Sequence, residues 1–460
     1  MELGYNSKSY YFLPATVSFI FLLQIILAYI YANQRIYLDS SYYLFKVVNY
    51  QQLQVEHQRY ILAFSQLLPW LGSQLHLPMK HLIVLHSLNY LFWWTLVLTI
   101  CWVRYHSVIH ILAIAFSTIL GITMIWFSPM YEVWYAIPLI ILVDAILIQF
   151  GKAKLIDYFL LFYSISTVLF AYPTLVTVLI FLFLYRRIGF KGNRYIIIFA
   201  LATIIWLIIK YFFISDYELA KLNFQVGNGN SSLLAKISSL QFYVSSVQYL
   251  FSAYYDLVLI FILSIGILIF KGKVKNAALL ICAFIFFTSI IYITHQPEGL
   301  KPIYERLHCM LIPIVLISFI EANKSIQGNK SLVLLALILV IGKCYQLNSI
   351  AENTFIPRYS LYLSYINKAT KNACPNLIIK QTKLQKDNDL TEWSMSMELA
   401  LISSTNEKKF TPNIVSDVDY QSCETLLKEK PFILRSSESI SFKDLNSYYF
   451  NPKVCTAINE

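Results

Sequence analysis

Eleven runs of mostly apolar residues, separated by short polar connectors, constrain what this chain can fold into. A helix needs about 20 such residues to cross the hydrocarbon core of a bilayer. The runs cover residues 10–32, 80–101, 108–127, 133–150, 155–172, 173–186, 195–214, 251–270, 277–294, 307–321 and 331–348. Charged residues make up 13% of the 460-residue chain, about half of the roughly 25% typical of a soluble domain. The sequence predicts an all-α polytopic membrane protein with about 11 transmembrane helices.

Basic residues concentrate in every second connector, and Lys and Arg accumulate in the short cytoplasmic loops of membrane proteins. With a cytoplasmic N-terminus, the cytoplasmic segments carry Lys8, Arg104, Lys152, Lys154, Arg186, Arg187, Lys191, Arg194, Lys271, Lys273, Lys275, Lys324 and Lys330. The short outer turns at 128–131 and 171–174 carry none. We therefore expect a cytoplasmic N-terminus and, after eleven spans, an extracytoplasmic C-terminal tail. The short loops favour a bacterial inner (plasma) membrane.

The chain divides into two predicted domains. Residues 1–349 form the transmembrane domain, and residues 350–460 form a small mixed α/β domain. In the first outer loop, 33–79, the amphipathic stretches 42–54 and 60–76 are expected to lie along the membrane surface as helices. The tail has thirteen acidic and thirteen basic residues, so the net charge of +11 belongs to the transmembrane part. Positive charge spread over short connectors indicates a bilayer and no nucleic acid as partner.

Asp39 is the first candidate for chemistry. It follows the first apolar run by a few residues and is flanked by aromatic side chains. A carboxylate at the edge of a bilayer is partly desolvated, which raises its pKa and suits it to general-base work. The alternative is that Asp39 caps a helix over 40–49, and both roles are compatible.

An acid, a base and a cation follow in the same loop: Glu56, His57 and Arg59. Such a group could bind a polyhydroxylated ligand or a phosphate, or it could be the polar start of a helix. Glu132, which ends an outer turn, is a weaker candidate of the same kind.

The outer connector between the ninth and tenth runs is short and dense in functional groups. Its candidates are His295, Glu298, Lys301, Arg306 and His308. Arg306 and His308 open the tenth predicted helix, where free backbone N–H groups and a guanidinium together favour an anion. A lipid-linked phosphate at headgroup depth would fit there. The alternative is a surface ion pair of Arg306 with Glu298 or Glu305.

Several familiar motifs are absent from the sequence. It has no Walker A motif, no GxGxxG after a strand, no HExxH and no GxSxG. Nucleotide hydrolysis, dinucleotide redox chemistry and zinc proteolysis are therefore without support. No cofactor is assigned, and a divalent metal stays open.

This layout resembles that of the GT-C-type integral membrane glycosyltransferases that use polyprenyl-phosphate-linked sugars. Those proteins have an acidic residue just after the first span, two membrane-surface helices in the same loop and often a C-terminal extracytoplasmic domain. Asp39 occupies the acidic position, and 42–54 and 60–76 match the surface helices. Many members carry a paired acidic motif, whereas here Ser40 and Ser41 follow Asp39.

The resemblance implies inverting transfer of a sugar from a polyprenyl-phosphate donor to an extracytoplasmic glycan, lipid or protein acceptor. Asp39 would take the proton from the acceptor hydroxyl. Arg306, with Arg59 or Lys301, would hold the charge of the departing phosphate. Further candidates for substrate binding are Glu56, His57, Glu132, His295, Glu298 and His308.

Three other functions remain open, and one of them is a non-catalytic membrane scaffold whose tail binds a partner. A polysaccharide polymerase or O-antigen-ligase-like protein shares lipid-linked substrates, but its key groups usually lie in one Arg-rich central outer loop, and here that loop has only Lys221 and Lys236. A lipid or sugar transporter often shows two similar halves with broken helices, and the sequence shows no such duplication.

Overall fold

The computed structural model of the protein describes most of the chain. The described residues are 7–148, 153–186, 193–215, 219, 240–294, 305, 308–322, 330–371, 378–380, 393–405, 413–415, 431–435 and 438–450.

The described chain is mostly helical, and each of the eleven predicted apolar runs contains a helix. These helices are α1 (Ser7–Ile30), α5 (Met79–Tyr105), α6 (Val108–Ser117), α7 (Glu132–Ile148), α8 (Leu155–Ala171), α9 (Leu175–Tyr185), α10 (Asn193–Phe213), α14 (Tyr255–Phe270), α15 (Val274–Thr294), α17 (Leu311–Ala322) and α18 (Lys330–Ile350). Their apolar composition makes this a helical membrane protein.

Three described helices are long and apolar enough to cross a bilayer alone: Met79–Tyr105, Asn193–Phe213 and the helix over Leu334–Lys368. A fourth is added if α13 (Leu240–Ala253) and α14, bent by 104° at their junction, count as one span. The other apolar helices have fully described stretches of 10–17 residues, such as Pro14–Ile30 and Val274–Ser289.

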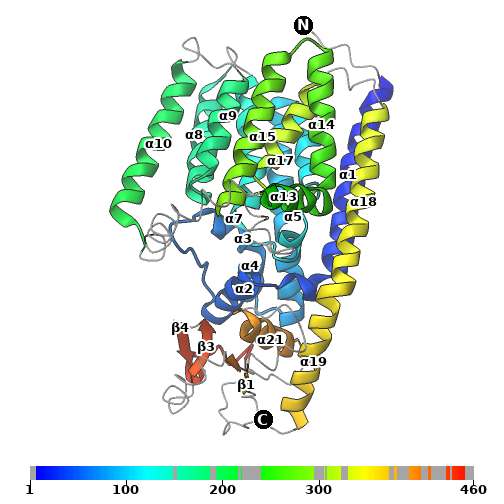
Figure 1. Ribbon diagram of the computed structural model, residues 1–460. Helices are drawn as coiled ribbons and strands as arrows, with labels where there is room; N and C mark the ends of the chain where they lie inside the picture. Colours follow the sequence, from blue (N-terminus) through cyan, green and yellow to red (C-terminus); the bar gives the residue numbers. More distant parts are fainter. Residues whose placement is uncertain are drawn as a thin grey trace.

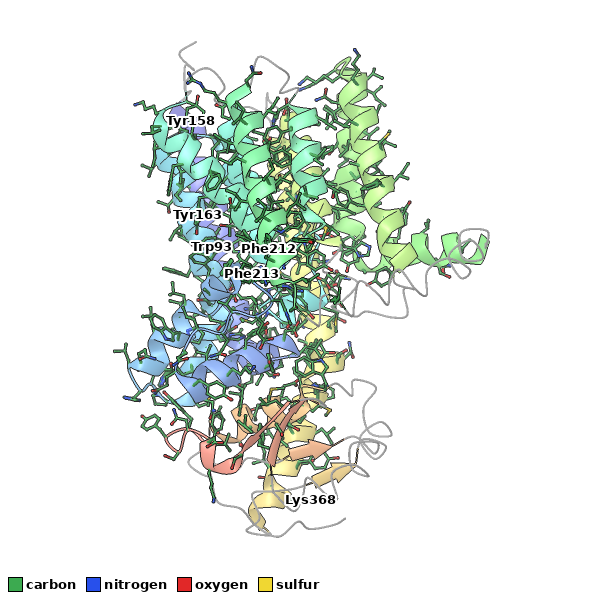
Figure 2. The ribbon with its side chains drawn as sticks, turned by 90° about the vertical axis from the view of Figure 1, so that its left-hand side faces the viewer. Trp93, Tyr158, Tyr163, Phe212, Phe213 and Lys368 are labelled. Carbon is green, nitrogen blue, oxygen red and sulfur yellow. The ribbon has the colours of Figure 1, made fainter. Side chains whose placement is uncertain are left out.

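The helices of the bundle differ sharply in exposure. Every residue of α7 except Ile148 is buried, so this helix occupies the centre. Only 6% of the apolar window of α10 is buried. Figure 1 shows α10 at one edge of the bundle, where its apolar side chains are available to lipid. Figure 2 shows Phe212 and Phe213 near its last turn, and both rings are mostly exposed.

The third predicted run is broken. Its helix α6 ends at Ser117, and the chain then passes through Gly121, with a φ of +76°, to a single 3-10 turn, η2 (Met124–Phe127). Irregular backbone inside a membrane protein needs polar partners from elsewhere. The Gly121 N–H donates to Asp256 at 2.6 Å, and the Met124 N–H donates to Glu305 at 2.5 Å. These buried carboxylates stabilise the break.

The first loop after α1 folds into short helices at the end of the bundle opposite the start of α1 (Figure 1). They are η1 (Ala32–Arg35), α2 (Asp39–Tyr50), α3 (Ile61–Ser65) and α4 (Leu67–Gln74). The expected helices over 42–54 and 60–76 are thus present with shifted bounds, the second one split in two. Ten of the twelve residues of α2 are buried. The rest of the protein therefore surrounds α2, and the polar side chains of α2 contact other side chains.

The tail begins without a break in the helix. A π-helical turn, η5 (Ala351–Phe355), joins α18 to α19 (Ile356–Lys371), so the expected domain boundary at 349/350 falls inside continuous helix. Mixed α and β elements follow: β1 (Ile378–Lys380), α21 (Met395–Ser403), β2 (Asn413–Val415), β3 (Pro431–Arg435), β4 (Glu438–Ser441) and η6 (Phe442–Asp444). Strand β1 pairs in parallel with β2, and β3 pairs antiparallel with β4.

The tail and the first loop share one hydrophobic core. The ring of Phe45 in α2 stacks on Phe432 at 5.1 Å and lies 4.8 Å from Phe450, between centroids. The Asn446 N–H donates to Asn49 Oδ1 at 2.8 Å, which fixes the register between the two layers. Figure 2 shows the order along the molecule, with bundle helices, then first-loop helices, then the tail.

Candidate functional site

Asp39 begins α2, directly below the bundle, and is half-buried. The N-cap position belongs to Leu38, so Asp39 lies within the first turn and is not the capping residue. A carboxylate in the first turn interacts favourably with the helix dipole. Leu38 has a φ of 53° and a ψ of −125°, a conformation that leucine rarely adopts. The chain therefore turns sharply just before Asp39.

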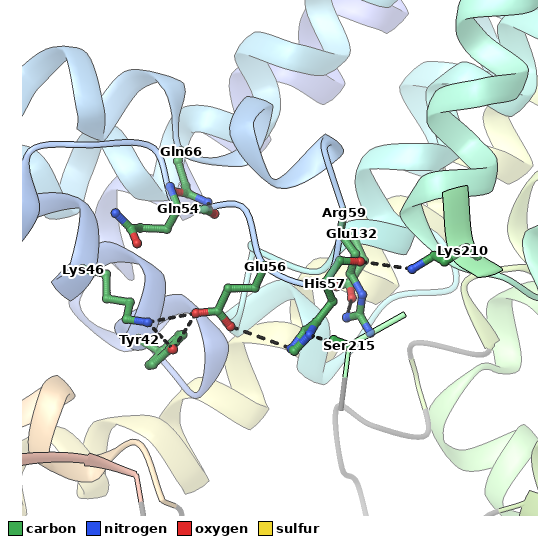
Figure 3. A network of polar contacts seen from close by, with 10 residues as sticks. All are labelled: Tyr42, Lys46, Gln54, Glu56, His57, Arg59, Gln66, Glu132, Lys210 and Ser215. Carbon is green, nitrogen blue, oxygen red and sulfur yellow. Dashed lines mark hydrogen bonds and ion pairs between the residues drawn. The ribbon is translucent and has the colours of Figure 1, made fainter. Parts of the chain in front are cut away.

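Glu56 lies beside α2 and is bound by two of its side chains (Figure 3). The Tyr42 hydroxyl donates to Glu56 Oε1 at 2.6 Å, and Lys46 Nζ donates to the same oxygen at 2.9 Å. Tyr42 and Lys46 are four residues apart, so they share one face of the helix. This face of α2 thus holds a partly buried ion pair, with side-chain exposures of 10% for Lys46 and 21% for Glu56.

His57 connects the first loop to the last turn of α10. Its Nδ1 lies 3.0 Å from the Ser215 hydroxyl, and its carbonyl accepts from Lys210 Nζ at 3.1 Å. His57 and Gln58 both have positive φ, 53° and 59°. Such strained residues persist only where their surroundings hold them, and they gather at functional sites.

Arg59 pairs with Glu132, the first residue of α7, through its NH1. The pair is nearly enclosed, with side-chain exposures of 12% and 4%. The same guanidinium lies 5.9 Å from the centre of the Tyr172 ring. This contact ties the first loop to the most buried helix of the bundle.

Tyr43 lies within electrostatic reach of three of the carboxylates. Burial raises the pKa of this phenol well above its usual value, and the charges of Glu56, Asp39 and Glu132 raise it further, while Arg59 lowers it. These groups are therefore near enough to act on one side chain. Tyr43 remains a neutral hydroxyl at any physiological pH.

The site as described combines the carboxylates of Asp39, Glu56 and Glu132 with the cations Lys46, Arg59 and Lys210. Lys46 pairs with Glu56, and Arg59 pairs with Glu132. Within the described ranges, no group of three or more His, Cys, Asp or Glu side chains is arranged to hold a metal ion.

The second cluster expected from the sequence is only partly described. His295, Glu298, Lys301 and Arg306 lie outside the described residues. His308 is buried, and its ring stacks on Tyr254 at 4.6 Å, where α13 meets α14. Its neighbour Glu305 is also buried, and it accepts from the Thr123 hydroxyl at 2.6 Å. Both described members thus support the broken segments of the bundle.

The structure adds residues that the site prediction did not include. Lys210 is the one basic residue in its apolar run, an unusual position that often has a functional reason. Lys46 and Tyr42 could have been found from their helical spacing in α2. Ser215 carries no signal in the sequence, because only folding brings it to His57.

No family model, no curated protein and no solved structure matches this chain.

Proposed function

We propose that the protein is a membrane glycosyltransferase of the GT-C type. It would move a sugar from a polyprenyl-phosphate donor to an extracytoplasmic glycan, lipid or protein acceptor, with inversion at the anomeric carbon. The observation that carries this proposal is the convergence of carboxylates and cations at one end of an apolar bundle, next to a lipid-exposed helix.

The lipid-exposed helix is α10, and its last turn and the chain just after it supply two of the groups that contact His57. Lys210 and Ser215 lie at the end of α10 where its apolar surface meets the polar site. A polyprenyl chain could lie along the exposed residues of α10 while its phosphate reaches Lys210 and Arg59. Both cations are suited to neutralise the phosphate as it leaves.

Asp39 acts as the general base in this proposal. Its carboxylate accepts the proton of the acceptor hydroxyl as the hydroxyl oxygen bonds to the anomeric carbon. The bond between that carbon and the phosphate oxygen breaks, and the electron pair leaves with the phosphate. Since phosphate is a good leaving group, the reaction demands no strong general acid.

Glu56 is the group best placed to bind sugar or acceptor hydroxyls. Tyr42 and Lys46 hold one of its oxygens and thereby fix its orientation. Arg306 and Lys301 remain predicted phosphate ligands, and His295, Glu298 and His308 remain predicted substrate contacts, on sequence grounds.

The proposal includes a topology of eleven spans in a bacterial inner membrane. The N-terminus is cytoplasmic, and the first loop and the tail are extracytoplasmic. It is supported by the position of the first-loop helices and the tail at one end of the bundle, opposite the start of α1 (Figure 1). On the outer side, Asp39 would meet lipid-linked donors.

A transporter is the second candidate, because one observation favours it. Helices α13 and α14 are bent by 104° at Tyr254, and transporters build their substrate sites from such broken helices. Transport would move a lipid-linked sugar without breaking the bond between sugar and phosphate. Chemical analysis of the product distinguishes the two.

The test is sugar transfer by the purified protein in vesicles that contain a labelled polyprenyl-phosphate sugar and an acceptor. Asp39→Asn removes the base with almost no change in shape, and transfer should fall about 10²-fold or more. Asp444→Asn, an exposed carboxylate on the same side, is the matched control and should keep wild-type activity. A folded Asp39→Asn protein that transfers sugar at the wild-type rate would refute the proposal.

A further inference from the structure

The carboxylate of Glu398 in α21 is buried and accepts hydrogen bonds from an unusual number of groups. Arg358 in α19 binds it in a bidentate manner, with Nε at 2.9 Å from Oε2 and NH2 at 3.0 Å from Oε1. The Tyr362 hydroxyl donates to Oε2 at 2.8 Å, and the Ser394 hydroxyl donates to Oε1 at 2.6 Å. Both oxygens are therefore fixed in position.

The fifth donor is the backbone of the residue before Asp39. The Leu38 N–H points to Glu398 Oε1 at 3.4 Å, across 360 positions of sequence. On the other side of the same residue, the Ser41 hydroxyl donates to the Leu38 carbonyl at 2.7 Å. Both backbone polar groups of Leu38 are thus held while it adopts its strained conformation, with a φ of 53°.

Arg358 also contacts the residue one step further back. Its guanidinium carbon lies 5.0 Å from the centre of the Tyr37 ring and 5.2 Å from that of Tyr362. The ion pair therefore contacts two consecutive residues, Tyr37 and Leu38, immediately before Asp39.

A pair that only anchored the tail would not need these contacts. The rings of Phe45, Phe432 and Phe450 already join the tail to α2. What the ion pair adds is a hydrogen bond to the backbone of Leu38, the strained residue directly before α2 and Asp39.

We propose that Glu398, oriented by Arg358, is a positioning residue that sets the direction of the Asp39 carboxylate through the backbone of Leu38. This inference rests on the proposed function of Asp39 as the base. It makes the tail part of the catalytic arrangement: the acceptor can be deprotonated efficiently only while α21 is docked on the first loop.

Two double variants separate positioning from stability. Removing only one partner would leave an uncompensated buried charge and could unfold the protein, whereas removing both charges is often tolerated. Arg358→Met with Glu398→Gln removes the charges and keeps an acceptor oxygen for Leu38. Arg358→Met with Glu398→Leu removes the charges and the acceptor. The difference between the two measures the loss of the acceptor that the Leu38 N–H shares with Tyr362 and Ser394.

The first readout needs no sugar transfer. With Asp39→Cys added to each double variant, the rate of thiol alkylation reports how firmly position 39 is held. The Glu398→Leu protein should be alkylated several-fold faster than the Glu398→Gln protein. Equal rates in the two would overturn the inference, whatever Asp39 does. If the Glu398→Leu protein does not fold, Ser394→Ala replaces it, because this change removes one of the hydrogen bonds that hold Glu398 Oε1. Alkylation at position 39 should again be faster, and an unchanged rate would overturn the inference.

The second readout is kinetic. The Glu398→Leu protein should have a kcat about 10- to 100-fold below that of the Glu398→Gln protein, because small misplacements of a catalytic group cost that much. The KM for the donor should be almost unchanged, since the cations that bind phosphate are untouched. Different alkylation rates with no sugar transfer even by the wild-type protein would refute the proposed function and leave the positioning role standing.

Discussion

The ion pair between Arg59 and Glu132 gives the sharpest stability prediction. Arg59→Met removes the cation and leaves the Glu132 carboxylate, whose side chain is 4% exposed, without its partner. Breaking a buried pair in this way costs about 3–5 kcal/mol of the free energy of unfolding, because the remaining charge stays desolvated. For this site the upper half of that range is expected, since Glu132 begins the most buried helix of the bundle.

A double-mutant cycle tests this magnitude. Arg59→Met combined with Glu132→Gln removes both charges and should recover most of the lost stability. Glu132→Gln alone should be the milder single change, because Arg59 is more exposed than Glu132, 12% against 4%, and can extend its side chain towards water.

Each purified variant is heated in detergent and then run on gel filtration. The quantity compared is the temperature at which the monodisperse peak has fallen to half its height. The expected order, from least to most stable, is Arg59→Met, then Glu132→Gln, then the double variant. If the double variant is no more stable than Arg59→Met, Glu132 does not depend on Arg59 and the reasoning is refuted.

Three further predictions follow from the structure. Lys210→Met should lower kcat/KM for the polyprenyl-phosphate donor at least about tenfold, because one charged hydrogen bond to the departing phosphate contributes roughly 1.5–3 kcal/mol. Steady-state kinetics in vesicles measures this ratio, and an unchanged kcat/KM would remove Lys210 from the donor site. Gly121→Ala should lower the melting temperature, because Gly121 has a φ of +76° and an added Cβ would lie 2.8 Å from Ile312 Cγ1. A melting temperature equal to that of the wild type would contradict the described break after α6. Phe45→Ala should lower the free energy of unfolding by about 3–5 kcal/mol, because it leaves a cavity between α2 and the tail. Limited proteolysis should then cut the tail faster. An unchanged cutting rate would show that this core does not hold the tail.

Hydrophobic runs allowed the helices to be predicted well. Each run contains a helix because a long apolar segment in a membrane must satisfy its own backbone hydrogen bonds. The third run shows the limit of this reasoning. Its second half is as apolar as a span, but Asp256 and Glu305, far away in sequence, satisfy its backbone and make a non-helical path stable.

The site could be predicted in part for a similar reason. Asp39, Glu56, His57 and Arg59 lie within one loop, so their proximity follows from the sequence. The contacts that organise them do not, since Lys210 reaches His57 across 153 positions and Glu398 reaches Leu38 across 360. Only the tertiary fold brings these groups together, and no local pattern encodes their pairing.

The central claim is that this protein breaks the bond between a sugar and a polyprenyl phosphate. The most direct measurement is the release of free polyprenyl phosphate from a doubly labelled polyprenyl-phosphate sugar in sealed vesicles that contain the purified protein. The account predicts that label in the sugar moves to the acceptor as free polyprenyl phosphate accumulates in equal amount, and that Asp39→Asn stops both. Movement of the intact donor across the vesicle membrane, with no free polyprenyl phosphate formed, would contradict the account and establish transport in its place.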